Sequence, residues 1–208
     1  MNILHISSSA RGAESYSNRV ATRVLDELRA RNPGATLVTR DLARDPLPHI
    51  DEDFVVATRS PNGPQTEKQR DLLALSNALV DELLAADVVV IATPMINFTI
   101  PSNLKSWLDY VARAGRTFSY SEAGPKGLAA GKQVILVAAK GGVYSANPAF
   151  DFQVPYLRSV LGFLGMTDVE VLDVEGTAYG PEVAEKAVEA ASAKMHATCE
   201  KRVAAAAA

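Results

Sequence analysis

A serine-rich segment near the start of the chain contains the residue types that bind a phosphate group. Five serines fall between Ser7 and Asn18, after an apolar run and before a helical pattern. A phosphate dianion needs hydroxyl donors and free backbone amides, and the start of a helix supplies such amides together with a favourable dipole. We therefore predict a phosphate-binding loop that includes Ser9, Ser15 and Ser17. The alternative is a serine-rich helix cap without a ligand, because serine is a favoured capping residue.

A second candidate loop, Thr93–Pro101, places one polar side chain among apolar ones. Apolar side chains that leave a buried strand can cover a flat aromatic ligand, while backbone amides and an asparagine side chain can meet the polar edge of its ring. Five consecutive residues of this loop are predicted to contact such a ligand: Pro94, Met95, Ile96, Asn97 and Phe98. The alternative is that the loop packs only on its own domain.

A third candidate loop, Ala139–Tyr144, contains a pair of glycines directly after an apolar run. Paired glycines let the backbone approach a flat ligand closely or adopt a positive φ. We predict ligand contacts from Ala139, Lys140, Gly141 and Gly142. A simple turn is the alternative for this loop alone, but three such loops at one rim are more specific than any one of them.

The remaining chemically active residues do not form a further site in the sequence. The three histidines have no metal-ligand spacing, so no metal site is predicted, and His5 is expected to be a satisfied core residue. Cys199 is the one cysteine of the chain, so no internal disulfide can form, and its helical context favours a structural thiol. Asp109 and Arg113 are expected to be a solvated or interface pair, and Arg11 either a phosphate contact or a solvated side chain.

Five apolar segments, separated by helical patterns, are predicted to be the strands that position these loops. The third and fourth are continuous runs, VVVIA and VILVA, which is typical of parallel strands covered on both faces. The strands are Ile3–Ile6, Thr36–Arg40, Val88–Ala92, Val134–Ala138 and Val169–Val174. The helices are Asn18–Arg31, Glu67–Ala86, a third from Pro101 to Val111, a fourth from Pro155 to Leu164, and a last one from Pro181.

This alternation predicts a single α/β domain over residues 1–208, a three-layer sandwich with right-handed crossovers. Five strands fit the flavodoxin-like order 2-1-3-4-5, in which the ligand lies at the carboxyl ends of the strands beside the first and third. The segments Asp45–Thr66 and Arg113–Gly131 are interpreted as insertions in this plan.

The composition excludes several classes of protein. The chain has 208 residues, 48% of them hydrophobic, and a formal net charge of -3, which argues against nucleic acid or an anionic membrane as main partner. Triphosphate-loop and dinucleotide-binding glycine motifs are absent. The sequence contains no apolar run of about 18 residues that could span a membrane, and its start lacks a secretion-signal pattern. We therefore expect a cytoplasmic protein.

Four stretches of the sequence, in the expected order, resemble the FMN-dependent NADH-azoreductases, also described as NADH:quinone reductases. They are the serine loop, the run ATPMINFTIPSNLKSWLDYVARAGRTFSY, the Lys-Gly-Gly after the fourth strand, and the late run GFLGMTDVEVLDVEGTAYGPE. The resemblance implies a flavodoxin-like homodimer with one FMN per subunit and active sites at the dimer interface. It also implies ping-pong hydride transfer from NADH or NADPH through the flavin to a quinone or an azo compound.

The resemblance also assigns roles to single residues. It implies that Ser9, Ser15, Tyr16 and Ser17 lie at the FMN phosphate, that Met95–Phe98 and Ala139–Gly142 lie at the flavin ring, and that the flavin leaves no catalytic residue to name. Ile96 stands where the family often has tyrosine, and Tyr144 where it often has histidine, so both bear on substrate preference. We expect a substrate pocket lined by Phe98, Tyr120, Tyr144 and Phe163, with Tyr120 or Phe163 coming from the partner subunit.

Three other functions fit the same fold. A flavodoxin-type electron carrier binds FMN without turnover, although the two insertions and the mild net charge count against it. A flavin reductase would release reduced FMN instead of retaining it. A regulatory or structural α/β protein would bind no flavin at all.

Overall fold

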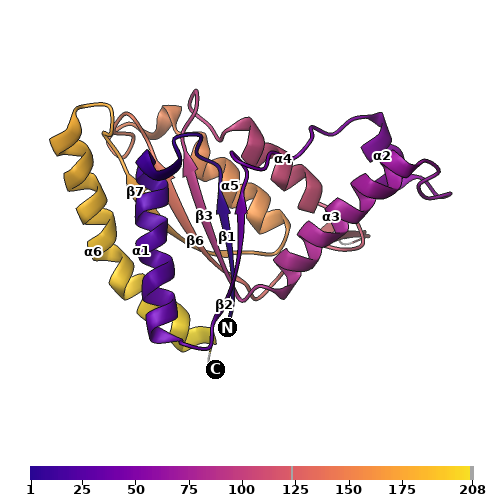
Figure 1. Ribbon diagram of the computed structural model, residues 1–208, viewed down its shortest axis with the longest axis horizontal. Helices are drawn as coiled ribbons and strands as arrows, with labels where there is room; N and C mark the ends of the chain where they lie inside the picture. Colours follow the sequence, from indigo (N-terminus) through magenta and orange to yellow (C-terminus); the bar gives the residue numbers. More distant parts are fainter. Residues whose placement is uncertain (123, 207–208) are drawn as a thin grey trace.

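The continuous apolar runs of the sequence form the inner strands of a five-stranded parallel sheet, as Figure 1 shows. The computed structural model describes residues 1–122 and 124–206. The strands of this sheet are β1 (Asn2–Ser7), β2 (Thr36–Asp41), β3 (Val88–Pro94), β6 (Gln133–Ala139) and β7 (Asp168–Val174). All five predicted strand segments are therefore confirmed as strands.

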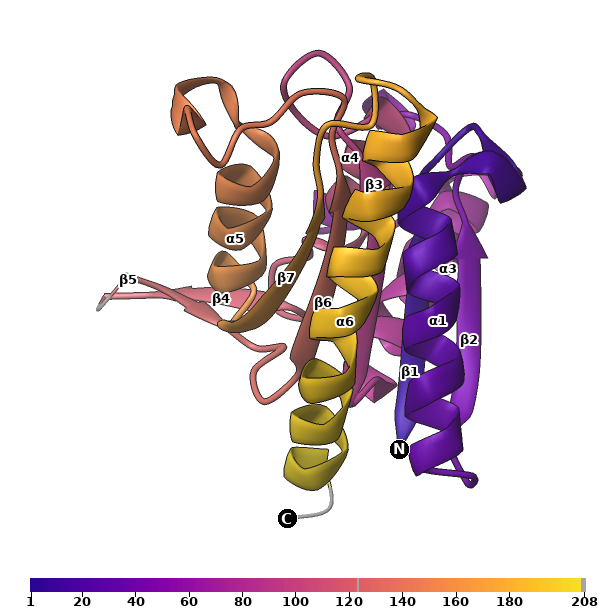
Figure 2. The same cartoon turned by 90° about the vertical axis from the view of Figure 1, so that its left-hand side faces the viewer.

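The order of the sheet is β2-β1-β3-β6-β7, not the predicted 2-1-3-4-5. The numbering differs because the sequence prediction missed two strands between the third and fourth predicted ones. These are β4 (Phe118–Ser121) and β5 (Gly124–Gly127), which pair antiparallel in a separate hairpin within the predicted insertion. The fourth and fifth predicted strands are accordingly β6 and β7. The hairpin projects sideways from the sheet, away from the helical layers (Figure 2).

Helices cover both faces of the sheet in two layers (Figure 1). One layer contains α1 (Tyr16–Arg31) and α6 (Pro181–Ala206), and the other contains α3 (Glu67–Ala85), α4 (Ser102–Val111) and α5 (Gln153–Phe163). The predicted helices are confirmed, although α5 begins two residues before Pro155 and Pro101 caps α4 instead of opening it. A further helix, α2 (Glu52–Arg59), forms within the other predicted insertion.

The two layers explain why β3 is apolar from Val88 to Ala92. Val88, Val90 and Ala92 pack in the core under α1 and α6, whereas Val89 and Ile91 pack in the core under α3, α4 and α5. Successive strand residues point to opposite faces, so a strand covered on both faces must be apolar throughout. Within the described residues, no helix is long and apolar enough to cross a membrane.

Side-chain caps fix the starts of α1 and α3. Thr66 and Gln69 form a reciprocal capping box at α3, and the Ser15 hydroxyl accepts from the Asn18 amide at α1 (3.3 Å).

The described residues contain no group of three or more histidine, cysteine or acidic side chains that could hold a metal ion.

Cys199 and His5 are titratable side chains that lie buried in this framework. Burial raises the pKa of the Cys199 thiol to about 12, which agrees with a structural thiol and excludes an activated nucleophile. His5 is buried in β1 as predicted, but the expectation of a satisfied side chain is wrong, because its Nε2 has no hydrogen-bond partner among the described residues. Burial lowers the pKa of His5 to about 4, with a smaller opposing effect of Asp41.

The buried imidazole makes stability depend on pH. Below pH 6.5 the unfolded chain takes up a proton at His5, whereas the folded protein does not until about pH 4, so stability falls as the pH drops through this window. We expect His5 to remove about 2 kcal/mol from the free energy of unfolding between pH 7.5 and pH 5. Urea unfolding of the wild type and of His5→Val at both pH values measures this contribution. The prediction fails if the two proteins lose the same free energy over that interval.

Candidate active site at the carboxyl edge of the sheet

The loops after β1, β3 and β6 meet at the carboxyl edge of the sheet and are joined there by backbone hydrogen bonds. The Ser8 amide donates to the Ala92 carbonyl (3.1 Å), and the Met95 amide donates to the Ala139 carbonyl (2.7 Å). The Asn103 side chain at the start of α4 donates to the Ser8 carbonyl (3.1 Å). The parallel register of the three strands therefore brings the three predicted loops to one rim, as the sequence indicated.

The five serines of the serine loop are buried and closely hydrogen-bonded, whereas residues 10–14 between them are exposed. The hydroxyls of Ser15 and Ser17 lie 3.0 Å apart, and the Ser9 hydroxyl accepts from the Arg11 amide (3.4 Å). Asn18 closes the loop, because its side chain accepts from the Ser7 hydroxyl (2.9 Å) and donates to the carbonyl of Gly12 (3.2 Å). The loop is thus held in shape before any ligand arrives.

Two backbone amides at the start of α1 remain without an acceptor. In the described part of the chain, no acceptor is recorded for the amides of Tyr16 and Ser17 in the first helical turn. The positive end of the helix dipole lies at the same place. The Tyr16 ring lies beneath the guanidinium groups of Arg11 (5.1 Å) and Arg19 (5.8 Å). Arg19 is paired with Glu185 (2.6 and 2.7 Å), so Arg11 adds the positive charge near this end of the helix. The arrangement suits a bound anion.

The loop after β3 is a tight turn with a left-handed backbone. The amide of Ile96 donates to the Thr99 carbonyl (2.8 Å) and the Thr99 amide donates back (3.1 Å). Between them, Asn97 and Phe98 have φ of 46° and 72°. The side chains of Ile96 and Phe98 are 48% and 50% exposed, so this loop does not pack only on its own domain.

The loop after β6 is fixed by hydrogen bonds to the segment after β7. The carbonyl of Gly141 accepts from Ala178 (3.0 Å), and that of Gly142 accepts from Gly176 (2.9 Å). Neither Gly141 nor Gly142 has a positive φ, so the conformational reason for a glycine pair does not apply. A Cβ at Gly142 would lie 3.2 Å from the Tyr144 ring, so close approach by a ring of the chain itself is the reason here.

The side chain of Lys140, a residue predicted to contact the ligand, is engaged within the chain. It is 3% exposed, and its ammonium donates to carboxylates instead. Asp109 and Arg113 are not a pair either, because Asp109 bonds Lys105 (2.5 and 2.7 Å) and Arg113 bonds the Ser76 hydroxyl (2.6 Å).

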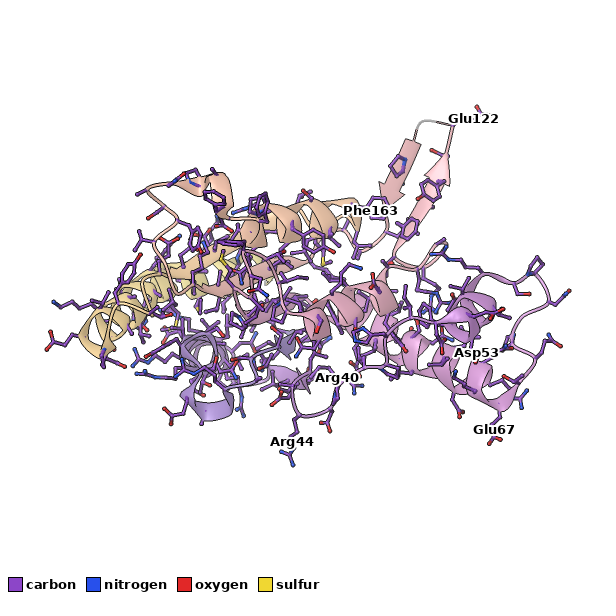
Figure 3. All side chains as sticks on the ribbon, turned by 90° about the horizontal axis from the view of Figure 1, so that it is seen from above. Arg40, Arg44, Asp53, Glu67, Glu122 and Phe163 are labelled. Carbon is purple, nitrogen blue, oxygen red and sulfur yellow. The ribbon has the colours of Figure 1, made fainter. Side chains whose placement is uncertain are left out.

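The four residues predicted to line a substrate pocket lie in different places within one protomer. Phe163 lies at the base of the β4–β5 hairpin, whose tip carries Glu122 (Figure 3). Its ring is 4.7 Å from that of Phe118, and the Phe118 ring is 5.4 Å from that of Tyr120. A cavity of about 460 Å³ between α2 and this hairpin includes Tyr120 and Phe163 but neither Phe98 nor Tyr144.

Phe98 lies at the opposite end of α5 from Phe163. Its carbonyl accepts from the amide of Phe152, directly before α5, and Phe163 ends that helix of 11 residues, about 16 Å away along the axis. Tyr144 lines a separate cavity of about 240 Å³ beside Lys140. Neither cavity brings Phe98 and Tyr120 together, and the composition of the substrate pocket stays a prediction.

The sequence interpretation missed two exposed aromatic residues at the rim. Phe150 and Phe152 are 55% and 56% exposed, and the Phe150 ring lies 5.8 Å from that of Phe98. The signal in the sequence is the run PAFDF, where two aromatic residues stand in an otherwise polar loop before α5. It also missed Gln153, which is buried and donates to the Thr93 carbonyl (3.4 Å).

A parallel sheet in this order, with loops free at the carboxyl edge beside β1 and β3, defines the flavodoxin-like class. The model of a protein family described as having the flavodoxin-like fold matches residues 1–199. Two curated relatives are named FMN-dependent NADH:quinone oxidoreductase. The one from Mesorhizobium japonicum is 50% identical over the full length of both chains. The one from Agrobacterium fabrum is 56% identical over 93% of this chain and 96% of its own.

A solved azoreductase from Bacillus anthracis has the same fold, with a TM-score of 0.88 and 32% identity, covering 97% of this chain and 99% of its own. The chain therefore belongs to the family of FMN-dependent NADH:quinone oxidoreductases with the flavodoxin-like fold.

The left-handed turn leads to a test of backbone strain. Asn97→Val should lower the free energy of unfolding by about 1–2 kcal/mol, because a β-branched side chain is strained at positive φ. Asn97→Gly should leave stability nearly unchanged, since glycine adopts this conformation freely. Thr99→Val is the matched control, because Thr99 lies in the same turn without a positive φ. Equal losses for both valine variants in urea unfolding would contradict the strain argument.

Proposed function

We propose that this protein binds one FMN per subunit at the carboxyl edge and reduces quinones and aromatic azo compounds with NADH or NADPH. The observation that carries the proposal is the pair of acceptor-free amides of Tyr16 and Ser17, which lie beside buried serine hydroxyls at the start of α1. A phosphate dianion is the natural ligand for such a helix start. The named activity of the relatives, at 50–56% identity, supports the same conclusion.

The other two loops fit the flavin ring. The Asn97 and Phe98 amides have no recorded acceptor within the described chain, so they are free to donate to the ring carbonyls and nitrogens. The exposed side chains of Ile96 and Phe98 offer apolar surface for the ring. Residues proposed for the phosphate end are Ser9, Ser15, Tyr16 and Ser17, and those for the ring end are Pro94, Met95, Ile96, Asn97, Phe98, Ala139, Gly141 and Gly142.

When bound, FMN supplies the redox chemistry, in which a hydride from NAD(P)H reaches the flavin and two electrons then pass to the acceptor in a ping-pong cycle. Reduction of a quinone to a hydroquinone consumes this hydride and one proton from water. The chain contributes binding and orientation. The free amides of Asn97 and Phe98 would hydrogen-bond the ring edge, and the apolar rim would exclude water from the face on which donor and acceptor stack by turns.

We further propose that the protein works as a homodimer with both sites at the interface. Tyr120 is 72% exposed on a projecting hairpin, and Phe163 lies at its base. Exposed apolar groups at two separate places, this hairpin and the rim around Phe98, are a pattern that a two-fold contact can bury, with each hairpin against the partner's rim.

The serine hydroxyls give the first test. The double substitution of Ser9 and Ser17 by alanine should weaken FMN binding by about 2–4 kcal/mol, because each hydroxyl would bond a charged phosphate oxygen. Quenching of FMN fluorescence measures the affinity. Ser159→Ala, which removes a hydroxyl bonded within α5, is the control and should bind FMN like the wild type.

Activity of the wild type separates the remaining functions. We expect NADH oxidation with menadione or benzoquinone and retention of FMN during gel filtration. Full FMN loading without turnover would identify an electron carrier, and rapid loss of FMN on reduction would identify a flavin reductase. An absence of FMN quenching in the wild type would overturn the proposal as a whole.

Subunit mixing tests the shared site. With both proteins saturated with FMN, Phe98→Ala and the double variant Tyr120→Ala, Phe163→Ala should each raise the KM for the quinone. The double variant should keep the FMN affinity of the wild type, whereas Phe98→Ala also removes apolar surface from the ring site. Mixed dimers carry one intact site if Phe98 and the hairpin come from different subunits, so co-refolding should restore about a quarter of the wild-type activity. No recovery on mixing, with dimers present, would place both groups of residues in the same subunit's site.

A further inference from the structure

A buried ammonium lies directly behind the candidate active site. Lys140 is 3% exposed, and its Nζ lies 2.8 Å from Asp151, 2.7 Å from Asp173 and 3.4 Å from Glu175. The three carboxylates come from three segments: Asp151 follows the short helix η2 (Pro148–Phe150), Asp173 is in β7, and Glu175 follows β7. A buried charge is tolerated when it is paired and hydrogen-bonded, and all three bonds here serve that purpose.

Two of these carboxylates also hold the backbone of the rim. Asp151 accepts from the amides of Gln153 (2.9 Å) and Val154 (3.3 Å), and so fixes the start of α5. Phe152 lies between Asp151 and Gln153, and its amide donates to the Phe98 carbonyl (3.0 Å). Through Asp151, the ammonium is therefore connected to the left-handed turn after β3.

Glu175 fixes the segment after the glycine pair in the same way. Its two carboxylate oxygens accept from the amides of Tyr144 (3.1 Å) and Ser145 (3.2 Å). The backbone of Lys140 is itself bonded to the segment after β7, where its amide donates to Val174 (2.9 Å) and its carbonyl accepts from Thr177 (3.1 Å). One side chain thus joins the loops after β3, β6 and β7.

The charge balance makes this junction depend on the ammonium. Burial acts to lower the pKa of Lys140, but its hydrogen bonds to Asp151 and Asp173 outweigh burial, so that the pKa lies above its ordinary value. Burial likewise acts to raise the pKa of Glu175, and hydrogen bonds from Ser145 and Tyr144 outweigh it. Both shifts favour the charged forms of the Lys140 ammonium and the Glu175 carboxylate. Arg158 of α5 lines the same cavity of about 240 Å³ and is the other cation that faces it.

We propose that Lys140 is a positioning residue, whose ammonium holds the Phe98 turn and the Tyr144 segment in the geometry that the flavin ring requires. The inference rests on the proposed function for the identity of the ligand, FMN. The hydrogen bonds that hold the loops together do not depend on that proposal. Without the ammonium, the carboxylates of Asp151, Asp173 and Glu175 repel one another, and the two segments that Asp151 and Glu175 hold are driven apart.

FMN affinity tests the role of Lys140 in the holoprotein. Lys140→Met should weaken FMN binding roughly tenfold or more at pH 7.5, because the mostly buried carboxylates of Asp151 and Glu175 lose their counter-charge, whereas Asp173 is 44% exposed. Lys132→Met is the matched control, since Lys132 is also buried but donates to the carbonyls of Leu84 (2.6 Å) and Ala86 (2.8 Å) at the other edge of the sheet. The control should bind FMN within about twofold of the wild type.

The pH profile distinguishes positioning from a general loss of stability. In Lys140→Met the pKa of Glu175 rises because the ammonium that lowers it is gone, so at pH 5 this carboxylate repels its neighbours less and the affinity gap to the wild type should narrow. A merely destabilised protein would show the same or a larger gap at pH 5. Equal FMN affinity of Lys140→Met and wild type at pH 7.5, or a gap that acid does not narrow, would overturn the inference.

Hydrogen exchange tests the two arms of the junction separately and needs no flavin. Asp151→Asn should raise amide exchange in residues 96–99 and 152–154, whereas Glu175→Gln should raise it in residues 143–145. Exchange in β1 and α1 should stay unchanged in both. The same pattern from both variants, or none, would overturn the inference. If the wild type binds no FMN but the two variants show this crossed pattern, the proposed function is overturned and the positioning of the two segments still stands.

Discussion

The parallel register of β1, β3 and β6 is the constraint on which the rest of the structure depends. Parallel strands must all end at the same edge, and helices on both faces bury everything else. Within the sheet, the backbone amides and carbonyls are used in strand pairing, so amides that could bind a ligand lie in the loops beyond the strand ends. The bonds from Ser8 to Ala92 and from Met95 to Ala139 then fix the neighbouring loops to each other, so the site is held by the same ladder that holds the core.

The sheet could be predicted from the sequence because its inner strands carry their own signal. A run such as VVVIA is compatible with few environments other than a strand covered twice. The β4–β5 hairpin carries no such signal. Strand β5 reads GPKG, and its Gly127 lies against Gly165, where a Cβ would come within 2.2 Å of the backbone nitrogen. The need for a glycine at position 127 comes from a residue 38 positions away along the chain. No local pattern could therefore indicate β5, or show that the next two strands of the main sheet are the sixth and seventh of the chain.

The candidate site was predicted in part for a similar reason. The serine loop and the Asn97 turn lie within single segments, where residue type and position at a strand end already suggest the chemistry. The role of Lys140 depends on Asp151, Asp173 and Glu175, which the chain brings to it only on folding. A lysine beside two glycines looks like a ligand contact until its partners are known. The contact between the rings of Phe98 and Phe150 also forms only on folding, so the sequence did not indicate it.

The single thiol of the chain has a practical consequence. Cys199 is fully buried between α6 and α1, and its raised pKa leaves almost no thiolate at neutral pH. Maleimide and iodoacetamide reagents react with thiolates, so Cys199 should not react with them in the folded protein. A cysteine introduced on the projecting hairpin, in place of Ser121, would then accept a fluorophore or spin label selectively. Distances between labels on two chains could be read without first removing the natural cysteine.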